Sequence, residues 1–213
     1  MGIESMGLRE SKKQETRQLI SDHATRLFMK QGFEQTTIAE IATAARVAKK
    51  TVTNYFPRKE DLALDHHEQF TASLAAAVAG RSEGESPLAA LRREFAAALE
   101  QCSPVAGFAG HDFARMVADS PTLTARLRDL HDQREEALAA ALAATLADTR
   151  PPFAARAAAA LIGSAHRLLF QRIQELTLAG LPDDLIAATL TTEAAHVFDL
   201  LESALGDLPA QAA

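Results

Sequence analysis

The sequence predicts an all-α fold of about nine helices, and three observations carry this prediction. Apolar residues recur every three to four positions over most of the chain, which is the period of an amphipathic helix. No stretch shows a convincing strand pattern. Proline stands at a predicted helix start four times, and three of these prolines follow a serine that can cap the helix. These pairs are Ser86-Pro87, Ser103-Pro104, Ser120-Pro121 and Leu181-Pro182.

The first helix is predicted over residues 11–32. Ser11 and Gln14 have the spacing of a capping box, and Gly32 is a typical residue for the end of a helix. Residues 1–10 precede this helix and are expected to form a flexible arm.

Residues 37–56, TIAEIATAARVAKKTVTNYF, predict two short helices with a tight turn between them. Thr37 and Glu40 match a capping box at the start of the first helix. Pro57 ends the second helix, because the residue before a proline avoids the helical conformation. This pair of helices has the form of a helix-turn-helix.

The second of these helices has an apolar inner face and a polar, basic outer face. At 100° per residue, Val52 and Phe56 face inward, whereas Lys50, Thr51 and Asn54 face outward. The outward side chains provide the donors and acceptors that base edges and phosphates require. We therefore interpret residues 37–56 as a device that reads DNA.

The rest of the chain predicts six further helices, joined by short turns. Their expected ranges are 58–80, 87–101, 104–118, 121–148, 152–179 and 183–205. We expect residues 11–73 to form an N-terminal helix-turn-helix domain. The helix that begins near residue 58 joins it to a C-terminal helical domain over residues 74–213.

The charge is distributed unevenly between the two ends of the chain. Residues 1–62 hold 11 Lys and Arg against 8 Asp and Glu, although the whole chain has a net charge of −6. All six lysines lie within the first 59 residues. A polyanionic partner for this end is the simplest interpretation. The alternative is that these basic residues only solvate a helix face.

Composition and motifs argue against several other classes of protein. No apolar run approaches the roughly 20 residues that a bilayer span needs, and residues 1–13 do not resemble a secretory signal. The single cysteine excludes an internal disulfide framework. No glycine-rich phosphate loop, HExxH or GxSxG motif occurs, so no catalytic residue, metal site or cofactor is expected. The expected location is the bacterial cytoplasm, with the protein on the nucleoid when it is bound to DNA.

Residues 12 to about 70 resemble the tetracycline-repressor (TetR) family at many fixed positions. The matching residues are Gly32-Phe33, Thr36-Thr37, Val47, Thr51-Val52, Tyr55-Phe56-Pro57 and Lys59-Glu60-Asp61-Leu62. The resemblance implies a DNA-binding regulator, with Thr37 at a phosphate and Thr36 assisting there. It places Lys49, Lys50, Thr51, Thr53 and Asn54 in the major groove. It also implies that Tyr55 and Lys59 bind the DNA backbone.

The chain departs from this family pattern at four positions. Arg46 stands where the turn usually has glycine, which implies a costly backbone conformation unless the turn avoids positive φ. Ala48 and Arg58 replace serines, so two helices lose a capping oxygen. Thr53 stands where the family often has an aromatic residue. The operator sequence therefore does not follow from the resemblance.

The family pattern also implies a homodimer, since one short recognition helix gives modest specificity and dimers address palindromic double-stranded DNA. The helices at 152–179 and 183–205 are the expected interface, as a four-helix arrangement. The alternative is that their apolar faces only close a monomer core.

We expect a cavity for a small, mainly apolar effector in the C-terminal domain, where polar residues interrupt apolar helix faces. Asp112, Arg134 and His166 are predicted to point inward, either as a structural network or as ligand contacts. The other expected lining residues are Phe95, Leu99, Cys102, Phe108, Phe113, Met116 and Phe170.

The resulting hypothesis is a ligand-responsive transcriptional regulator, and its repressor role comes from the family pattern. One rival is a helical small-molecule-binding protein that keeps the fold but has lost specific DNA binding. A second rival is an enzyme in the C-terminal domain, for which no catalytic set is found.

Overall fold

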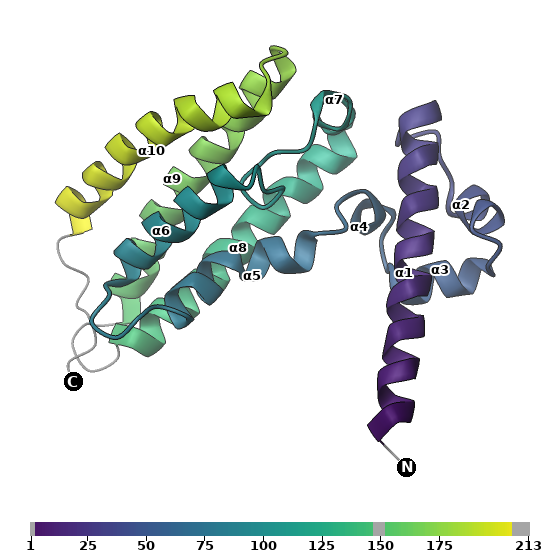
Figure 1. The fold of residues 1–213 in the computed structure, drawn as a ribbon, viewed down its shortest axis with the longest axis horizontal. Helices are drawn as coiled ribbons and strands as arrows, with labels where there is room; N and C mark the ends of the chain where they lie inside the picture. Colours follow the sequence, from purple (N-terminus) through teal and green to yellow (C-terminus); the bar gives the residue numbers. More distant parts are fainter. Residues whose placement is uncertain (1–2, 147–151, 206–213) are drawn as a thin grey trace. The chain divides into compact units, whose positions relative to one another are not determined.

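The computed structural model describes residues 3–146 and 152–205, and the regular secondary structure in these ranges is all helical. The all-α prediction is confirmed (Figure 1). The described residues form ten helices rather than nine. They are α1 (Ile3–Gln31), α2 (Ile38–Ala44), α3 (Lys49–Tyr55), α4 (Lys59–Ala63), α5 (His67–Ala79), α6 (Pro87–Glu100), α7 (His111–Asp119), α8 (Pro121–Leu146), α9 (Pro152–Leu178) and α10 (Asp183–Leu205).

Two of the predicted helices differ from those in the structure. The expected helix at 58–80 is interrupted at residues 64–66, where Leu64 leaves the helical region with φ −104° and ψ 54°. The expected helix at 104–118 begins only at His111, since residues 101–110 form turns. Gly107 and Gly110, with φ of 127° and 70°, adopt positive φ in this segment.

The start of α1 also differs from the prediction. Residues 3–10, which were expected to belong to a flexible arm, lie in the first turns of this helix. Its C-terminal end is as predicted, because Gly32 follows the last helical residue with a φ of 86°.

The chain divides into two compact units, and the division is not a single cut. The N-terminal unit contains the residues up to Asp65 together with Arg115–Arg126, and the C-terminal unit contains the remainder. The domain boundary predicted from the sequence, near residue 73, follows the end of this first segment by eight residues. The segment 115–126, at the end of α7 and the start of α8, was expected in the C-terminal domain.

The N-terminal unit is built around one apolar core. Helix α1 packs against α2 and α4, and α2 packs against α3. Segment 115–126 contributes Leu123, which is fully buried in this core. Its other large buried members are Ile20, Phe28, Phe33, Ile41, Val52, Phe56 and Leu62.

Three hydrogen-bonded contacts tie distant parts of the chain together in this unit. The Ser120 hydroxyl donates to the Glu34 carboxylate at 2.5 Å. The Arg126 guanidinium forms an ion pair with Asp61 at 2.9 Å, and both side chains are at most 10% exposed. The Ser21 hydroxyl on α1 donates to Asp65 at 2.7 Å, directly after α4.

The C-terminal unit is a bundle in which α6 packs against α5 and α10, and α10 packs against α9. Its core includes Leu91, Leu138, Leu142, Ile162, Ile173 and Phe198. None of the helices in the described ranges has the length and apolar content to cross a bilayer.

Candidate functional site

Helix α2 begins with the predicted capping box. The backbone N–H of Glu40 donates to the Thr37 hydroxyl at 3.2 Å, and the backbone N–H of Thr37 donates to the Glu40 carboxylate at 2.8 Å. The hydrogen bond from the Thr37 backbone is the main cause that lowers the pKa of Glu40. This reciprocal pair fixes the start of α2 and leaves the Thr37 side chain exposed.

The turn between α2 and α3 carries the strain that the sequence implied. Arg46 adopts a φ of 55°, a left-handed conformation that costs an L-residue roughly 1–2 kcal/mol. Neither Ala48 at the start of α3 nor Arg58 at the start of α4 makes a side-chain capping hydrogen bond. Both Arg46 and Arg58 are exposed, so each adds a cation beside α3.

Helix α3 separates its buried and exposed faces as predicted. Val52 and the following Phe56 are buried. The exposed residues are Lys49, Lys50, Thr53 and Asn54, whereas Thr51 and Tyr55 are half-buried. The free surface of α3 thus offers two ammonium groups, a hydroxyl and a carboxamide within two helical turns.

Two residues that the family resemblance placed at DNA make internal contacts in this structure. Thr36 is 1% exposed, and its hydroxyl donates to the Gly32 carbonyl at 2.8 Å. The Lys59 ammonium donates to the carbonyls of Phe33 at 2.9 Å and Thr36 at 3.1 Å. It also lies 4.2 Å from the centre of the Phe33 ring. These contacts close the loop between α1 and α2.

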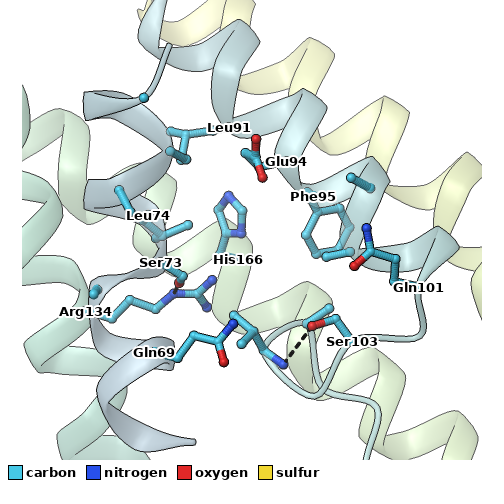
Figure 2. A pocket seen from close by; sticks show the side chains of 18 residues that line it. Gln69, Ser73, Leu74, Leu91, Glu94, Phe95, Gln101, Ser103, Arg134 and His166 are labelled. Atoms are coloured by element: carbon cyan, nitrogen blue, oxygen red, sulfur yellow. Dashed lines mark hydrogen bonds between the residues drawn. The ribbon is translucent and has the colours of Figure 1, made fainter. Parts of the chain in front are cut away.

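The C-terminal unit contains a cavity of about 430 Å³. This volume lies within the range of sites that bind drug-sized molecules. Figure 2 shows its lining, which comes from α5, α6 and the turn after α6, with one side chain each from α8 and α9. Much of the wall is small and apolar: Ala72, Ala76, Ala77, Ala97, Ala98 and Ala106.

Arg134 is the buried cation of this cavity. It is 6% exposed, its Nε–H donates to the Ser73 hydroxyl at 2.9 Å, and its guanidinium lies 4.5 Å from the centre of the Phe70 ring. Burial lowers the pKa of Arg134 to about 10, so the group is still charged at neutral pH. Among the described residues, no carboxylate lies within ion-pair distance of it.

Two buried histidines accompany this arginine. His166 lines the cavity, and its Nε2 has no hydrogen-bond partner in the described part of the chain. Burial, and then the nearby charge of Arg134, lower the pKa of His166 to about 3. The same causes lower the pKa of His131 to about 4. Both imidazoles are therefore neutral at pH 7.

Comparison with known proteins identifies the N-terminal unit. Residues 20–65 match the family model described as bacterial regulatory proteins, tetR family. The match spans α2, the strained turn, α3 and α4. This part of the chain is therefore similar to the DNA-binding domain of TetR-family regulators. The resemblance inferred from the sequence is thus confirmed.

A curated relative supports this assignment beyond the matched domain. The chain is 33% identical over 143 residues to the HTH-type transcriptional regulator TcmR of Streptomyces glaucescens, which covers 65% of this chain. The aligned region spans 63% of the length of TcmR. The family consists of regulatory proteins and not of enzymes.

Solved structures of TetR-type repressors share the fold over nearly the whole chain. NalD of Pseudomonas aeruginosa, the secondary repressor of the MexAB-OprM multidrug efflux pump, has a TM-score of 0.54 at 19% identity. That match covers 89% of this chain and 96% of NalD. FadR of Thermus thermophilus, a repressor solved with lauroyl-CoA, has a TM-score of 0.50 at 25% identity and covers 87% and 92%.

Three of the ten residues that the sequence suggested for the cavity do line it. They are Phe95, Arg134 and His166. Phe170 is buried beside Phe70 and His131, and the remaining apolar candidates also lie outside the lining. These are Leu99, Cys102, Phe108, Phe113 and Met116.

The expectation that Asp112 points inward is wrong. Its side chain is 82% exposed and contacts His111. The prediction assumed that residues 105, 108, 112 and 116 share one helix face. Because α7 starts only at His111, residues 105 and 108 lie outside the helix and do not indicate which of its faces is buried. Asp112 therefore belongs to no network with Arg134 and His166.

Sequence reasoning missed the polar lining from α5 and α6. Gln69, Ser73, Glu94, Gln101 and Ser103 line the cavity. Gln69 and Ser73 share a face of α5 with Ala76, Ala77 and Gly80, so a stripe of small and polar residues at helical spacing was the available signal. No cluster of three or more His, Cys, Asp or Glu in the described ranges could hold a metal ion.

Proposed function

We propose that this chain is a ligand-responsive, DNA-binding transcriptional regulator that acts as a repressor. A homodimer would bind a palindromic operator, and a small effector in the cavity of the C-terminal unit would release it. The observation that carries the proposal is the exposed, basic and polar face of α3 within a TetR-type helix-turn-helix.

The charge of this face suits double-stranded DNA. Lys49 and Lys50 are exposed on α3, Arg46 and Arg58 flank it, and no acidic residue occurs between Ile41 and Arg58. Lysine and arginine supply the sequence-independent attraction to phosphates, whereas Asn54 and Thr53 can read base edges. A member of the fold that had lost DNA binding would have no need to keep this face free of acids.

Exposed apolar side chains on α9 and α10 support a dimer through these two helices. Leu161 and Leu168 lie seven residues apart on one face of α9 and are 50% and 65% exposed. Leu185 and Leu200 on α10 are 53% and 71% exposed. A dimer interface would cover these side chains, and a two-fold axis would bring four helices together. The dimer would place two copies of α3 about one turn of DNA apart.

The cavity supports the effector step. Its volume fits a small organic molecule, and its lining lies within the C-terminal unit. A repressor of the same fold, FadR of Thermus thermophilus, was solved with lauroyl-CoA. An effector that binds more tightly to a dimer conformation in which the two copies of α3 cannot reach both operator half-sites would release the DNA. This would couple the cavity to DNA binding. Such a regulator acts in the bacterial cytoplasm, where its operator lies.

Fluorescence anisotropy with DNA from the region upstream of the chain's own gene tests the proposal. We expect selective binding over a scrambled duplex, with an affinity that falls steeply as salt is raised. Binding to both duplexes with the same affinity, or to neither at low salt, would favour the rival that keeps the fold without reading DNA.

Two substitutions on α3 separate base reading from phosphate binding. Asn54→Ala should weaken binding to the operator by roughly 5- to 100-fold and leave the scrambled duplex unaffected. Lys50→Ala should weaken binding to both duplexes alike and reduce the salt slope by about one. Equal behaviour of the two variants would contradict this division of roles.

A further inference from the structure

The cavity has an electrostatic imbalance that the proposed function leaves unexplained. It encloses one full positive charge, on Arg134, and no carboxylate of the described residues is paired with that charge. A buried charge without a partner is costly, so proteins rarely keep one unless something else neutralises it. A ligand with a negative group is the missing partner that this cavity can admit.

The hydrogen bonds of Arg134 leave most of its donors for a ligand. Within the described residues, only the Nε–H donates to a protein group, the Ser73 hydroxyl, which in turn donates to the Phe70 carbonyl at 2.8 Å. Ser73 thereby holds the guanidinium in place from α5. Figure 2 shows the guanidinium directed into the cavity beneath His166. Its two terminal nitrogens present a fork that matches two oxygens of one acidic group.

His166 adds a second, neutral contact. It is 4% exposed, and its Nε2 is without a partner in the described residues, although buried polar atoms are usually hydrogen-bonded. The ring is held by edge-to-face contacts with Phe95 at 5.5 Å and Phe198 at 5.7 Å. Burial and the positive field of Arg134 keep its pKa low, so it would donate one N–H rather than bring a second charge.

The acidic residue of the lining does not cancel this imbalance. Glu94 is about half exposed, and its carboxylate accepts a hydrogen bond from Arg93 at 2.5 Å. It does not figure among the groups that affect the pKa of Arg134 or His166. The remaining polar lining, Gln69, Gln101 and Ser103, is uncharged.

We propose that the cavity binds an organic acid: an apolar body against the alanine-rich walls of α5 and α6, with one anionic oxygen group bound by Arg134 and His166. This refines the expectation of a mainly apolar effector by giving it a charged head group. The regulatory role of this ligand rests on the proposed function, whereas its binding to the cavity requires no DNA.

Three naphthalene probes that differ in the head group alone test the inference on the full chain. They are 2-naphthoate, 2-naphthylmethanol and 2-naphthylmethylammonium. The chain has no tryptophan and one tyrosine, so the naphthalene emission can be followed with little protein background. We expect the carboxylate to bind at least 10-fold more tightly than the alcohol, and the ammonium to bind most weakly.

Variants show whether Arg134 causes this preference. Arg134→Met keeps an apolar stem without charge and should reduce the affinity for the carboxylate to that for the alcohol, with alcohol binding unchanged. His166→Phe keeps the aromatic contacts and should weaken the carboxylate about 3- to 10-fold. Arg167→Met is the matched control, since Arg167 follows His166 on α9 but pairs with Asp132 outside the cavity lining.

Thermal unfolding of the free variants separates a ligand contact from a structural one. Because no carboxylate of the described residues pairs with the charge of Arg134, Arg134→Met should unfold at a temperature equal to or above that of the wild type. A large drop in this temperature would assign Arg134 a structural role and overturn the proposal.

The proposal also fails if the three probes bind the wild type equally, if the ammonium binds best, or if none binds. It fails as well if Arg134→Met keeps the preference for the carboxylate. DNA binding measured without any probe is a separate readout. Its absence would refute the regulator and leave the result on anion binding unchanged.

Discussion

Single residues in this chain take on roles that their type and position in the sequence do not reveal. Lys59 matches a family position expected at the DNA backbone, yet its ammonium is bound to three carbonyls of the loop between α1 and α2. Arg46, by contrast, was expected to be strained if its turn kept the positive φ that glycine normally supplies, and it does adopt this conformation. The backbone conformation of Arg46 could be inferred because it replaces a glycine in a local turn. The hydrogen bond of Lys59 to Phe33 joins residues 26 positions apart, and no local pattern predicts it.

Replacement of Lys59 should therefore lower the stability of the free protein, whatever its effect on DNA binding. Lys59→Ala removes charged hydrogen bonds to the carbonyls of Phe33 and Thr36, which should lower the free energy of unfolding by roughly 1–3 kcal/mol. Chemical denaturation of the free protein, followed by circular dichroism, measures this change. Lys49→Ala, at an exposed position on α3, is the control and should leave the stability unchanged. Equal stabilities would mean that Lys59 is free to act at the phosphate backbone alone.

The two buried histidines make stability depend on pH. Their folded-state pKa values, about 4 for His131 and about 3 for His166, lie below the unfolded value of 6.5. The unfolded chain therefore takes up more protons below pH 6.5, and stability is lost as the pH falls from about 6.5 towards 4 and 3. Each histidine should lower the free energy of unfolding by on the order of 2 kcal/mol between pH 7 and pH 5.

Urea denaturation at pH 7 and pH 5 measures this loss. His166→Phe should remove about half of it, whereas His196→Gln, an exposed position on α10, should retain all of it. A wild-type protein whose stability is the same at both pH values would contradict the buried, neutral state of these rings.

At the scale of helices, the sequence predicted most starts and ends correctly, because the signals were local. Serine caps and prolines placed the starts of α6, α8, α9 and α10, with only α9 preceded by residues outside the described ranges. The break between α4 and α5 contains neither glycine nor proline. It coincides with the hydrogen bond between Ser21 and Asp65, a contact across 44 residues that no local pattern encodes. The late start of α7 is a different case, because residues 101–110 form turns and the first helical turn begins only after Gly110.

The missing cap of α3 can be restored. Ala48 is exposed and has the extended conformation of a capping residue, with φ −70° and ψ 147°, but no side-chain oxygen. Ala48→Ser should add a hydrogen bond to a free backbone N–H of the first turn and stabilise the protein by about 1 kcal/mol. Thermal unfolding measures the gain. Ala48→Val supplies no acceptor and should give none, so a similar gain from both would show that the cap is not its cause.

At the scale of the whole molecule, the N-terminal unit is completed by residues that follow it by more than fifty positions. Leu123, Ser120 and Arg126 all contact residues of the first 65. The family resemblance ended near residue 70, and the remaining sequence predicted architecture alone. This long-range packing depends on how two helices meet, so it could not be inferred from periodicity or capping.

The ion pair between Asp61 and Arg126 is the sharpest test of this arrangement. Arg126→Met should destabilise the N-terminal unit by about 3–5 kcal/mol, because it leaves a buried carboxylate without its partner. The double variant Asp61→Asn with Arg126→Met should recover much of this loss, and a double-mutant cycle on unfolding measures the coupling. Arg128→Met, two residues further along α8 and exposed, is the control. Additive effects of the two single substitutions would show that the pair contributes nothing.

The position of Leu123 in the N-terminal core has a practical consequence for exchanging parts between relatives. A fragment that stops at Asp65 would lack a fully buried leucine and the partners of Glu34 and Asp61. Chimeras that join the DNA-reading half of one family member to the sensing half of another must therefore carry residues 115–126 with the first 65. A chimera with a single junction after Asp65 would take residues 115–126 from the other protein and so separate side chains that pack in one core.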